Sequence, residues 1–238
     1  MSYISGMRPP NVRVTGDQFN DMLKAYGDGQ SWPLEFSQSV FGVGDVKLAS
    51  TVKEIPENVI FEGNLDASES KITIFDNEVR GDANFSGCAS LNYFGDKTKF
   101  KGNLDASKTG LGLFTCTVHG DANLGQCEHL HTIMGATVLG TLTASHCPAL
   151  GKFGAVVGRN LDLRRCGGLT EVEPGTRVLG DAISVGSSLP DGVFEKPLMA
   201  AAKSSHMAPR PLPIPDVPFT KVLEAAGIQI PSIGRTQE

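Results

Sequence analysis

The chain has 238 residues, 28 of them glycine, with 7% aromatic residues and a net charge of −5. This composition suits a fold of repeated tight turns, and the acidic balance argues against nucleic-acid binding, which needs clustered lysine and arginine. The sequence contains no run of 18 apolar residues, so no membrane span is predicted. It also has no apolar segment near the N-terminus, so no secretory signal is predicted.

Residues 1–40 are predicted to form an N-terminal cap that contains a short helix. Thr15 can begin this helix and Gly27 can end it. Between them, apolar and aromatic side chains recur at helical spacing: Phe19, Met22, Leu23 and Tyr26. Three residues that can pack on the first repeat follow: Trp32, Leu34 and Phe36. A repeat protein needs such a cap because its ends otherwise expose apolar surface.

Residues 41–190 contain a repeat, marked by a glycine that follows an apolar residue and one variable residue. The markers are 18 to 21 residues apart, and arginine once takes the place of glycine. They are Gly63, Gly81, Gly102, Gly120, Gly140 and Gly180, with Gly44 in a GVG triplet before them and Arg159 at the equivalent place in VGRNLDL. Such a period predicts stacked coils. Apolar residues stand two and four positions after the markers, which predicts a short strand with one face inward.

The seventh position after each marker holds a small side chain that can donate a hydrogen bond. These residues are Thr51, Ser70, Cys88, Thr109, Cys127, Cys147, Cys166 and Ser187. Carbonyl groups buried inside stacked turns need donors, so we predict a structural ladder within the coils. This explains four of the five cysteines, whose odd number and lack of a CxxC motif argue against a disulfide framework or a zinc ribbon.

The segment from Leu161 to Val172 has the pattern LxLxxCxxLxxV, which resembles the leucine-rich repeat. The short glycine-containing coils are similar to those of bacterial and phage-encoded repeat proteins, including effectors delivered into host cells. The resemblance covers residues 43–189, although alanine often replaces the strand leucine. It implies a mainly β fold class: a right-handed, single-strand-per-coil solenoid of about eight coils, with a helical cap and an extended tail. A hexapeptide β-helix is not favoured, because no aliphatic residue recurs every six positions.

Residues 191–238 are predicted to form a C-terminal tail with a proline-rich arm and a short helix. The prolines predict an extended, polyproline-like chain. An extended arm followed by a small amphipathic helix suits docking onto a partner. We assign that role to Pro211, Pro213, Pro215, Phe219 and Leu223. Packing of the tail on its own solenoid is the alternative.

The strand side chains that face outward form the concave surface of such a solenoid, and here most are Asp or Asn. The predicted binding residues are Asp45, Asp66, Asp82, Asn84, Asp105, Asp121, Asn123, Asp162 and Asp181. This surface favours a protein partner with a basic surface and a salt-sensitive association. The alternative is that a solvent-facing strand simply needs polar residues and that Asp and Asn begin turns well.

No motif predicts a catalytic residue, a metal site or a cofactor. Asp66 and Asp105 stand two coils apart, about 9–10 Å by the stacking distance, at the outer limit for an inverting glycosidase pair. Cys127, His129 and His131 form a CxHxH cluster, but Cys127 is predicted to face inward and zinc needs a fourth ligand. Walker, Rossmann and GxSxG motifs are absent.

We therefore predict a non-enzymatic repeat scaffold that mediates protein–protein interaction within a multi-subunit assembly such as a phage virion. The alternative is an effector-like module that captures a host protein on its Asp/Asn face, and a carbohydrate-active β-helix enzyme is least favoured. No nucleic-acid or membrane partner is predicted. We expect cytoplasmic synthesis, and leave open incorporation into a virion or delivery by a specialised secretion system.

Overall fold

The fold is described from a computed structural model of the chain. The structure describes residues 12–27, 41–56, 59–190 and 193–194. The chain divides into two compact units, residues 1–194 and 195–238, and every described residue belongs to the first. The predicted proline-rich arm and its helix lie outside the described residues, as do Trp32, Leu34 and Phe36.

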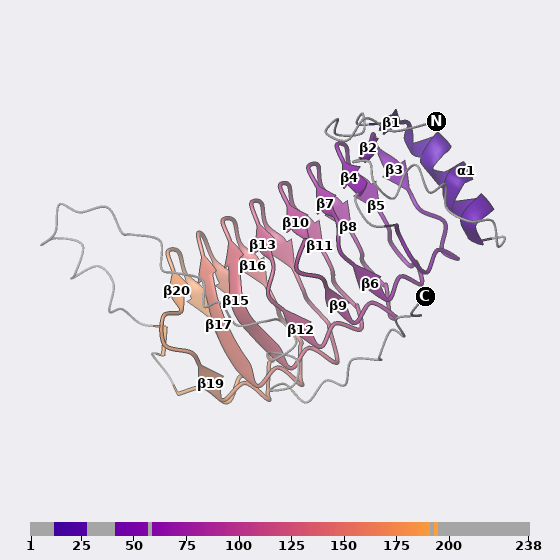
Figure 1. Ribbon diagram of the computed structural model, residues 1–238. Coiled ribbons are helices and arrows are strands. Elements are labelled where there is room, and N and C mark those ends of the chain that lie inside the picture. The colour runs from indigo at the N-terminus through magenta and orange to yellow at the C-terminus, as the bar shows by residue number, and fades with distance from the viewer. Residues whose placement is uncertain (1–11, 28–40, 57–58, 191–192, 195–238) are drawn as a thin grey trace, which may run out of the picture. The chain divides into compact units, whose positions relative to one another are not determined.

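The described chain is a parallel β-solenoid with one helix (Figure 1). Sheet A has eleven strands: β1 (Val12–Val14), β2 (Phe41–Val43), β4 (Val59–Phe61), β7 (Glu78–Val79), β10 (Lys99–Phe100), β12 (Leu113–Phe114), β13 (Thr117–Val118), β15 (Thr132–Val138), β17 (Lys152–Val157), β19 (Glu171–Val172) and β20 (Arg177–Val178). Sheet B has eight: β3 (Val46–Lys47), β5 (Leu65–Asp66), β8 (Ala83–Asn84), β11 (Leu104–Asp105), β14 (Ala122–Asn123), β16 (Leu142–Thr143), β18 (Leu161–Asp162) and β21 (Ala182–Ile183). A small third sheet pairs β6 (Ile74–Phe75) with β9 (Tyr93–Phe94).

The predicted fold class is confirmed: the protein is mainly β, its coils stack in parallel, and a helix stands at the N-terminal end. The structure differs in one respect, because most coils carry two short strands where the sequence predicted one. In the Gly81 coil, Val79 lies in β7 before the marker glycine and Ala83 lies in β8 after it. From Gly63 onward, the apolar residue that helped to identify each marker is therefore an inward-facing strand residue of sheet A.

The core consists of columns of inward side chains that repeat from coil to coil. We number positions from the marker, so that +1 follows it directly. In the five coils from Gly63 to Gly140, a leucine at +2, as at Leu65, goes with alanine at +4, as at Ala67, and an alanine at +2, as at Ala83, goes with a larger residue at +4, as at Phe85. All four side chains are buried. This exchange keeps the filled volume of these five coils similar, which explains their alanines that depart from the leucine-rich pattern.

The helix α1 (Gly16–Gly27) covers the first coil, as predicted for the cap. Thr15 and Gln18 form a capping box, in which the Gln18 N–H donates to Thr15 Oγ1 and the Thr15 N–H donates to Gln18 Oε1. The ring of Phe19 is fully buried and meets Phe61 edge-on, with 5.6 Å between centroids. The side-chain amide of Asn20 donates to the Lys47 carbonyl at 2.9 Å. The helix thus closes the N-terminal end of the core.

Each of the last seven coils turns through a left-handed residue at position +6. Five of these residues are not glycine: Glu69, Lys108, Gln126, His146 and Arg165, with φ between 57° and 61°. The other two are Gly87 and Gly186. A left-handed conformation costs an L-residue about 1–2 kcal/mol. The residue that follows this turn, at +7, is buried in six of these seven coils.

Candidate binding groove

A groove of about 730 Å³ runs over the outward face of sheet B, across β5, β8, β11, β14 and β16. Its polar side chains come from positions +1 and +3 of five successive coils. They are Asn64, Asp66, Asp82, Asn84, Asn103, Asp105, Asp121, Asn123, Thr141 and Thr143. The lining contains no lysine, arginine or histidine among the described residues. The groove is therefore a surface of carboxylate and amide groups.

The carboxylates alternate between the two columns from one coil to the next. The Gly63 coil has Asn64 at +1 and Asp66 at +3, whereas the Gly81 coil has Asp82 at +1 and Asn84 at +3. The next two coils repeat this order. Strands stack about 4.8 Å apart, and like charges side by side on neighbouring strands are destabilising. Alternation gives each of these carboxylates an amide neighbour within its own column.

The +1 column is a hydrogen-bonded ladder. The N–H of Asp82 donates to Asn64 Oδ1, and the N–H of Asn103 donates to Asp82 Oδ1, both at 2.8 Å. The same bond, from the +1 residue of the following coil, is accepted by Asp45, Asn103, Asp121 and Asn160 at 2.6–3.0 Å. These side chains therefore stabilise the coil stack, in agreement with the alternative that turn geometry selects Asp and Asn.

The ladder explains why glycine marks the coils from Gly63 onward, whereas a Cβ added at Gly44 would meet nothing within 4 Å. A Cβ added at Gly81 would lie 2.6 Å from Asn64 Oδ1 and 2.6 Å from the Gly63 carbonyl oxygen, closer than real Cβ contacts. The one coil without a marker glycine has Arg159, and the residue one coil earlier is Thr141, which has no amide or carboxylate oxygen to place there. The exception occurs where the ladder oxygen is missing.

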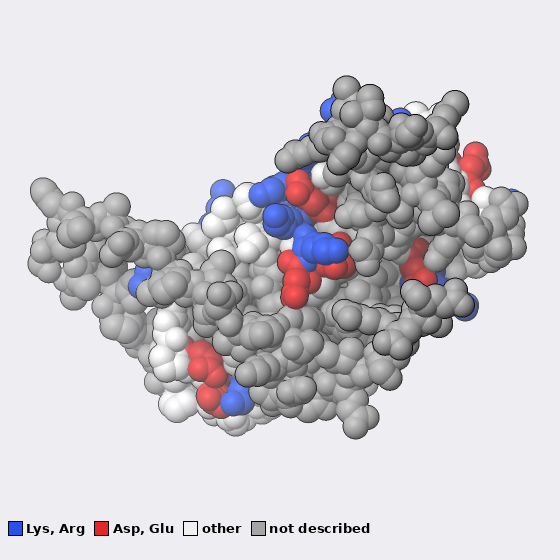
Figure 2. Space-filling view, viewed as in Figure 1, with Lys and Arg blue, Asp and Glu red and all other residues white. Residues whose placement is uncertain are grey.

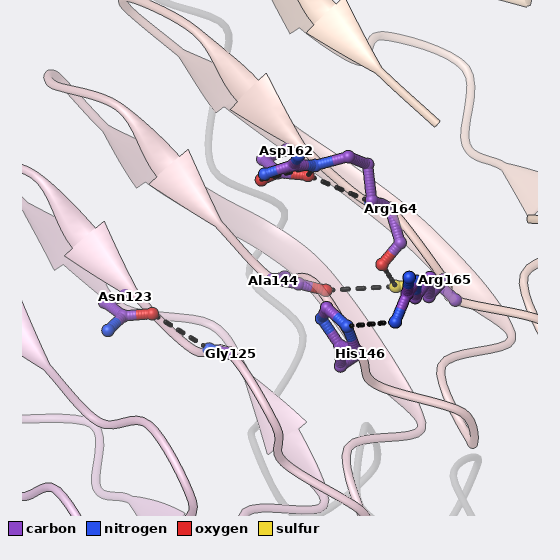
Figure 3. A network of polar contacts seen from close by, with 8 residues as sticks. Asn123, Gly125, Ala144, His146, Asp162, Arg164 and Arg165 are labelled. Atoms are coloured by element: carbon purple, nitrogen blue, oxygen red, sulfur yellow. Dashed lines mark hydrogen bonds and ion pairs between the residues drawn. The ribbon is translucent and has the colours of Figure 1, made fainter. Parts of the chain in front are cut away.

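At +3, the Oδ1 atoms close the turn that ends each strand. The N–H of Ser107 donates to Asp105 Oδ1 at 2.9 Å, and the side-chain amide of Asn123 donates to the same oxygen at 3.2 Å. Figure 3 shows the same turn closed at Asn123, which accepts from the N–H of Gly125 at 3.1 Å. These contacts hold the side chains in place through Oδ1, and no described residue bonds to the second oxygen of Asp105.

Cations neutralise the acidic surface at its ends but not in its middle. Lys47 Nζ lies 3.2 Å from Asp66 Oδ2, and Arg164 Nη2 lies 2.6 Å from Asp162 Oδ2 (Figure 3). Burial acts to raise the pKa of Asp66, but bonds from Ser68 and the charge of Lys47 outweigh it and lower that pKa. The bonds from Arg164 lower the pKa of Asp162. No described cation pairs with the three central carboxylates, Asp82, Asp105 and Asp121.

The structure places six of the nine predicted binding residues in the groove lining: Asp66, Asp82, Asn84, Asp105, Asp121 and Asn123. Asp45 lies beside the cap, and Asp162 and Asp181 belong to coils beyond the groove. The lining residues Asn64 and Asn103 were not among the predicted binding residues. They occupy the same +1 column as Asp82, so the repeat itself was the signal for them.

Six of the eight predicted ladder residues at +7 form one buried column. Each cysteine thiol in this column donates to the backbone carbonyl at position +4 of the preceding coil. Cys127 Sγ, for example, lies 3.2 Å from the Ala106 oxygen. The other thiol bonds are 2.9–3.2 Å long and involve Cys88, Cys147 and Cys166. Thr109 Oγ1 donates to the Ala106 oxygen at 2.9 Å. At the two ends of the column, Thr51 is exposed and Ser187 is half-buried.

The environment of these thiols shifts their pKa values in both directions: the contact with the Cys147 thiol lowers the pKa of Cys127 to about 7 and also lowers the pKa of Cys166. Burial raises the pKa of Cys88, and it raises the pKa of Cys116, outside the column, to about 12. Contacts with the thiols of Cys127 and Cys166 raise the pKa of Cys147. A protonated thiol can donate to a carbonyl, whereas a thiolate cannot. All five cysteines are buried and free of disulfides.

The residues weighed for metal or redox chemistry are spread apart. Cys127 is buried, whereas His129 and His131 are exposed. Among the described residues, no group of three or more His, Cys, Asp or Glu side chains could hold a metal ion. His146 faces Arg165, which donates to its Nε2 at 3.2 Å (Figure 3).

A second hollow, of about 1040 Å³, lies between α1 and the first coil. Its lining mixes acidic residues such as Asp17 and Asp21 with Lys24, Lys47 and Lys53. Because charges of both signs are present, this hollow favours no particular class of ligand. The groove over sheet B is therefore the stronger candidate.

Comparison with family models, with curated proteins and with solved structures finds no match to this chain. Within the part of the chain that the structure describes, no helix is both long and apolar enough to span a membrane.

Proposed function

We propose that this protein is a non-enzymatic repeat scaffold that holds a protein partner with a basic surface in the groove over sheet B. The observation that carries the proposal is the set of three central carboxylates, Asp82, Asp105 and Asp121, for which the described residues supply no cation. Each has its Oδ1 fixed by a backbone N–H, so the side chain is ordered before binding and loses little entropy on binding.

The composition of the groove supports binding rather than catalysis. Its lining has Asp, Asn and Thr over a floor of leucine and alanine, and the described part of the chain contributes no histidine, cysteine, lysine or serine to it. A general acid or an activated nucleophile usually needs a neighbour that perturbs its pKa. Rigid carboxylates spaced along a sheet instead match the ammonium and guanidinium groups of an extended basic segment.

Binding of a fluorescent oligolysine peptide, followed by anisotropy at low and at high salt, tests the proposal. The test variant is Asp82→Asn with Asp121→Asn, which removes two charges but keeps the ladder oxygens, because the chain itself uses Asn64 and Asn103 there. The matched control, Asp76→Asn with Asp96→Asn, removes two charges outside the groove.

We expect the test variant to bind about tenfold more weakly at low salt, since each exposed ion pair contributes about 0.2–1 kcal/mol, and the control to bind almost as tightly as the unchanged protein. Equal losses in both variants would mean that only net charge matters, and would contradict the groove as the site. Binding that is insensitive to salt would contradict the electrostatic basis.

Membership of a larger assembly, such as a phage virion, is part of the same proposal. It is supported by the apolar side chains exposed on the last coils. Deleting the chain after Pro209 tests the part assigned to the tail, which lies outside the described residues. A scaffold fastened by its tail loses incorporation into its assembly, whereas a module that works through the groove alone keeps its partner.

A further inference from the structure

The exposed large apolar side chains of the described chain all lie in its last third. The most exposed are Leu139 at 51%, Leu179 at 70%, Ile183 at 45% and Val185 at 74%; Val156 and Val193 complete the set. Exposed apolar residues are ordinary when scattered, but a concentration of them marks an interaction surface. The C-terminal coils are therefore candidates for an interface.

The repeat shows where this change occurs. The position just before each marker is charged or polar in four successive coils, at Glu62, Arg80, Lys101 and His119. In the same column the last coils have Leu139, Gly158 and Leu179. Figure 2 shows red and blue side chains gathered near the middle of the displayed face, white ones beside them to the left, and a second charged group at the lower left.

Sheet B changes in the same way at its last strand. Position +3 is Asp162 in β18 but Ile183 in β21, and position +5 is Arg164 and then Val185. Both apolar side chains take outward positions that are polar in the preceding coil. The change from polar to apolar residues thus occurs in both sheets at the same end of the stack.

The strand edges at this end are open among the described residues. β21 ends sheet B and pairs only with β18, and in sheet A β20 pairs only with β17. At the other end, α1 packs against β3 and covers the edge of sheet B (Figure 1). An open strand edge has unpaired N–H and C=O groups and readily pairs with another chain.

We propose that the coil formed by residues 177–189 pairs with the same coil of a second copy of this chain, giving a two-fold dimer joined end to end. The partner must offer open edges of two adjacent sheets together with an apolar surface. A second C-terminal coil has both features, whereas the N-terminal end has sheet B covered by α1. A two-fold interface uses one patch twice, so the open edges and apolar side chains of the two copies meet one another.

Sedimentation equilibrium of the full chain at concentrations from about 1 to about 100 µM, on the order of the Kd of a weak dimer, tests the proposal. The test variant is Leu179→Asp with Val185→Asp, and the matched control is Leu139→Asp with Val156→Asp. Both pairs place two charges on exposed apolar positions, but only the first lies on the last coil. We expect at least a tenfold weaker dimer for the test variant and an unchanged dimer for the control.

A second measurement does not require a charge on the last coil. Val185→Cys introduces an exposed thiol, whereas the native cysteines are all buried. A short bismaleimide, which adds one thiol to each of its two ends, should join two Val185→Cys chains but not two Leu139→Cys chains. A monomer at every concentration, including one in which residues 195–238 occupy this end, would overturn the proposal. So would equal cross-linking at the two positions.

Discussion

Changing Gly81 to alanine tests whether the hydrogen-bonded ladder of Asp and Asn at position +1 is the reason for glycine at the marker position. The added Cβ would lie 2.6 Å from Asn64 Oδ1 and 2.6 Å from the Gly63 carbonyl oxygen, so one or both must move. Overpacking of this kind costs about 1–3 kcal/mol. If the Asn64 side chain swings away, the N–H of Asp82 loses its 2.8 Å bond, at a cost of about 1 kcal/mol.

The informative comparison is the same change in an Asn64→Thr background. Threonine removes the ladder oxygen, as Thr141 does before Arg159. Gly81→Ala should then cost less than in the unchanged chain, with a coupling free energy of about 1 kcal/mol. Urea unfolding of the four proteins measures this coupling, and Gly167→Ala is the control because an added Cβ there meets nothing within 4 Å. Additive costs for the two changes would refute the reasoning.

Three further predictions concern the turn and the thiols. Lys108→Gly should raise the free energy of unfolding by about 1 kcal/mol, because Lys108 has a φ of 57°, whereas Lys99→Gly in β10 should lower it. Cys147→Ala should destabilise by about 1–3 kcal/mol in urea unfolding because the Leu124 carbonyl loses its donor, and Cys147→Ser should recover part of that loss. The free energy of unfolding should fall as the pH rises above 9, because the Cys116 thiol ionises near pH 9 in the unfolded chain but has a pKa of about 12 in the folded one. This group contributes a slope of about 1.4 kcal/mol per pH unit, and that slope should disappear in Cys116→Ala. Thermal unfolding between pH 8 and 10.5 measures that slope.

The repeat could be predicted from sequence because one chemical requirement recurs in every coil. The spacing of the markers located the strands of sheet B, and alternation about them identified inward residues such as Leu65 and Ala67. The cap was predictable because Thr15 begins a helix whose apolar side chains, Phe19 and Leu23, face one side.

What the sequence did not reveal depends on contacts between coils. The second strand was missed because a two-residue strand such as β7 has too few residues to show alternation by itself. The groove residues were predicted as a solvent-facing surface. The second role of Asp82, as a hydrogen-bond acceptor in the +1 ladder, is seen only in its bond to the next coil. The apolar surface at Val185 was not predicted, because a single apolar residue at a polar position is common in the last repeat of a solenoid and does not by itself indicate an interface.

Mapping of an oligolysine peptide by amide chemical shifts in the ¹⁵N-labelled protein tests the central claim most directly. The account predicts that the largest shift changes fall on β8, β11 and β14 and on Asp82 and Asp121, which directly precede β8 and β14, and that these changes fade in high salt. Changes centred on α1 or on sheet A, or spread evenly over the surface, would contradict it.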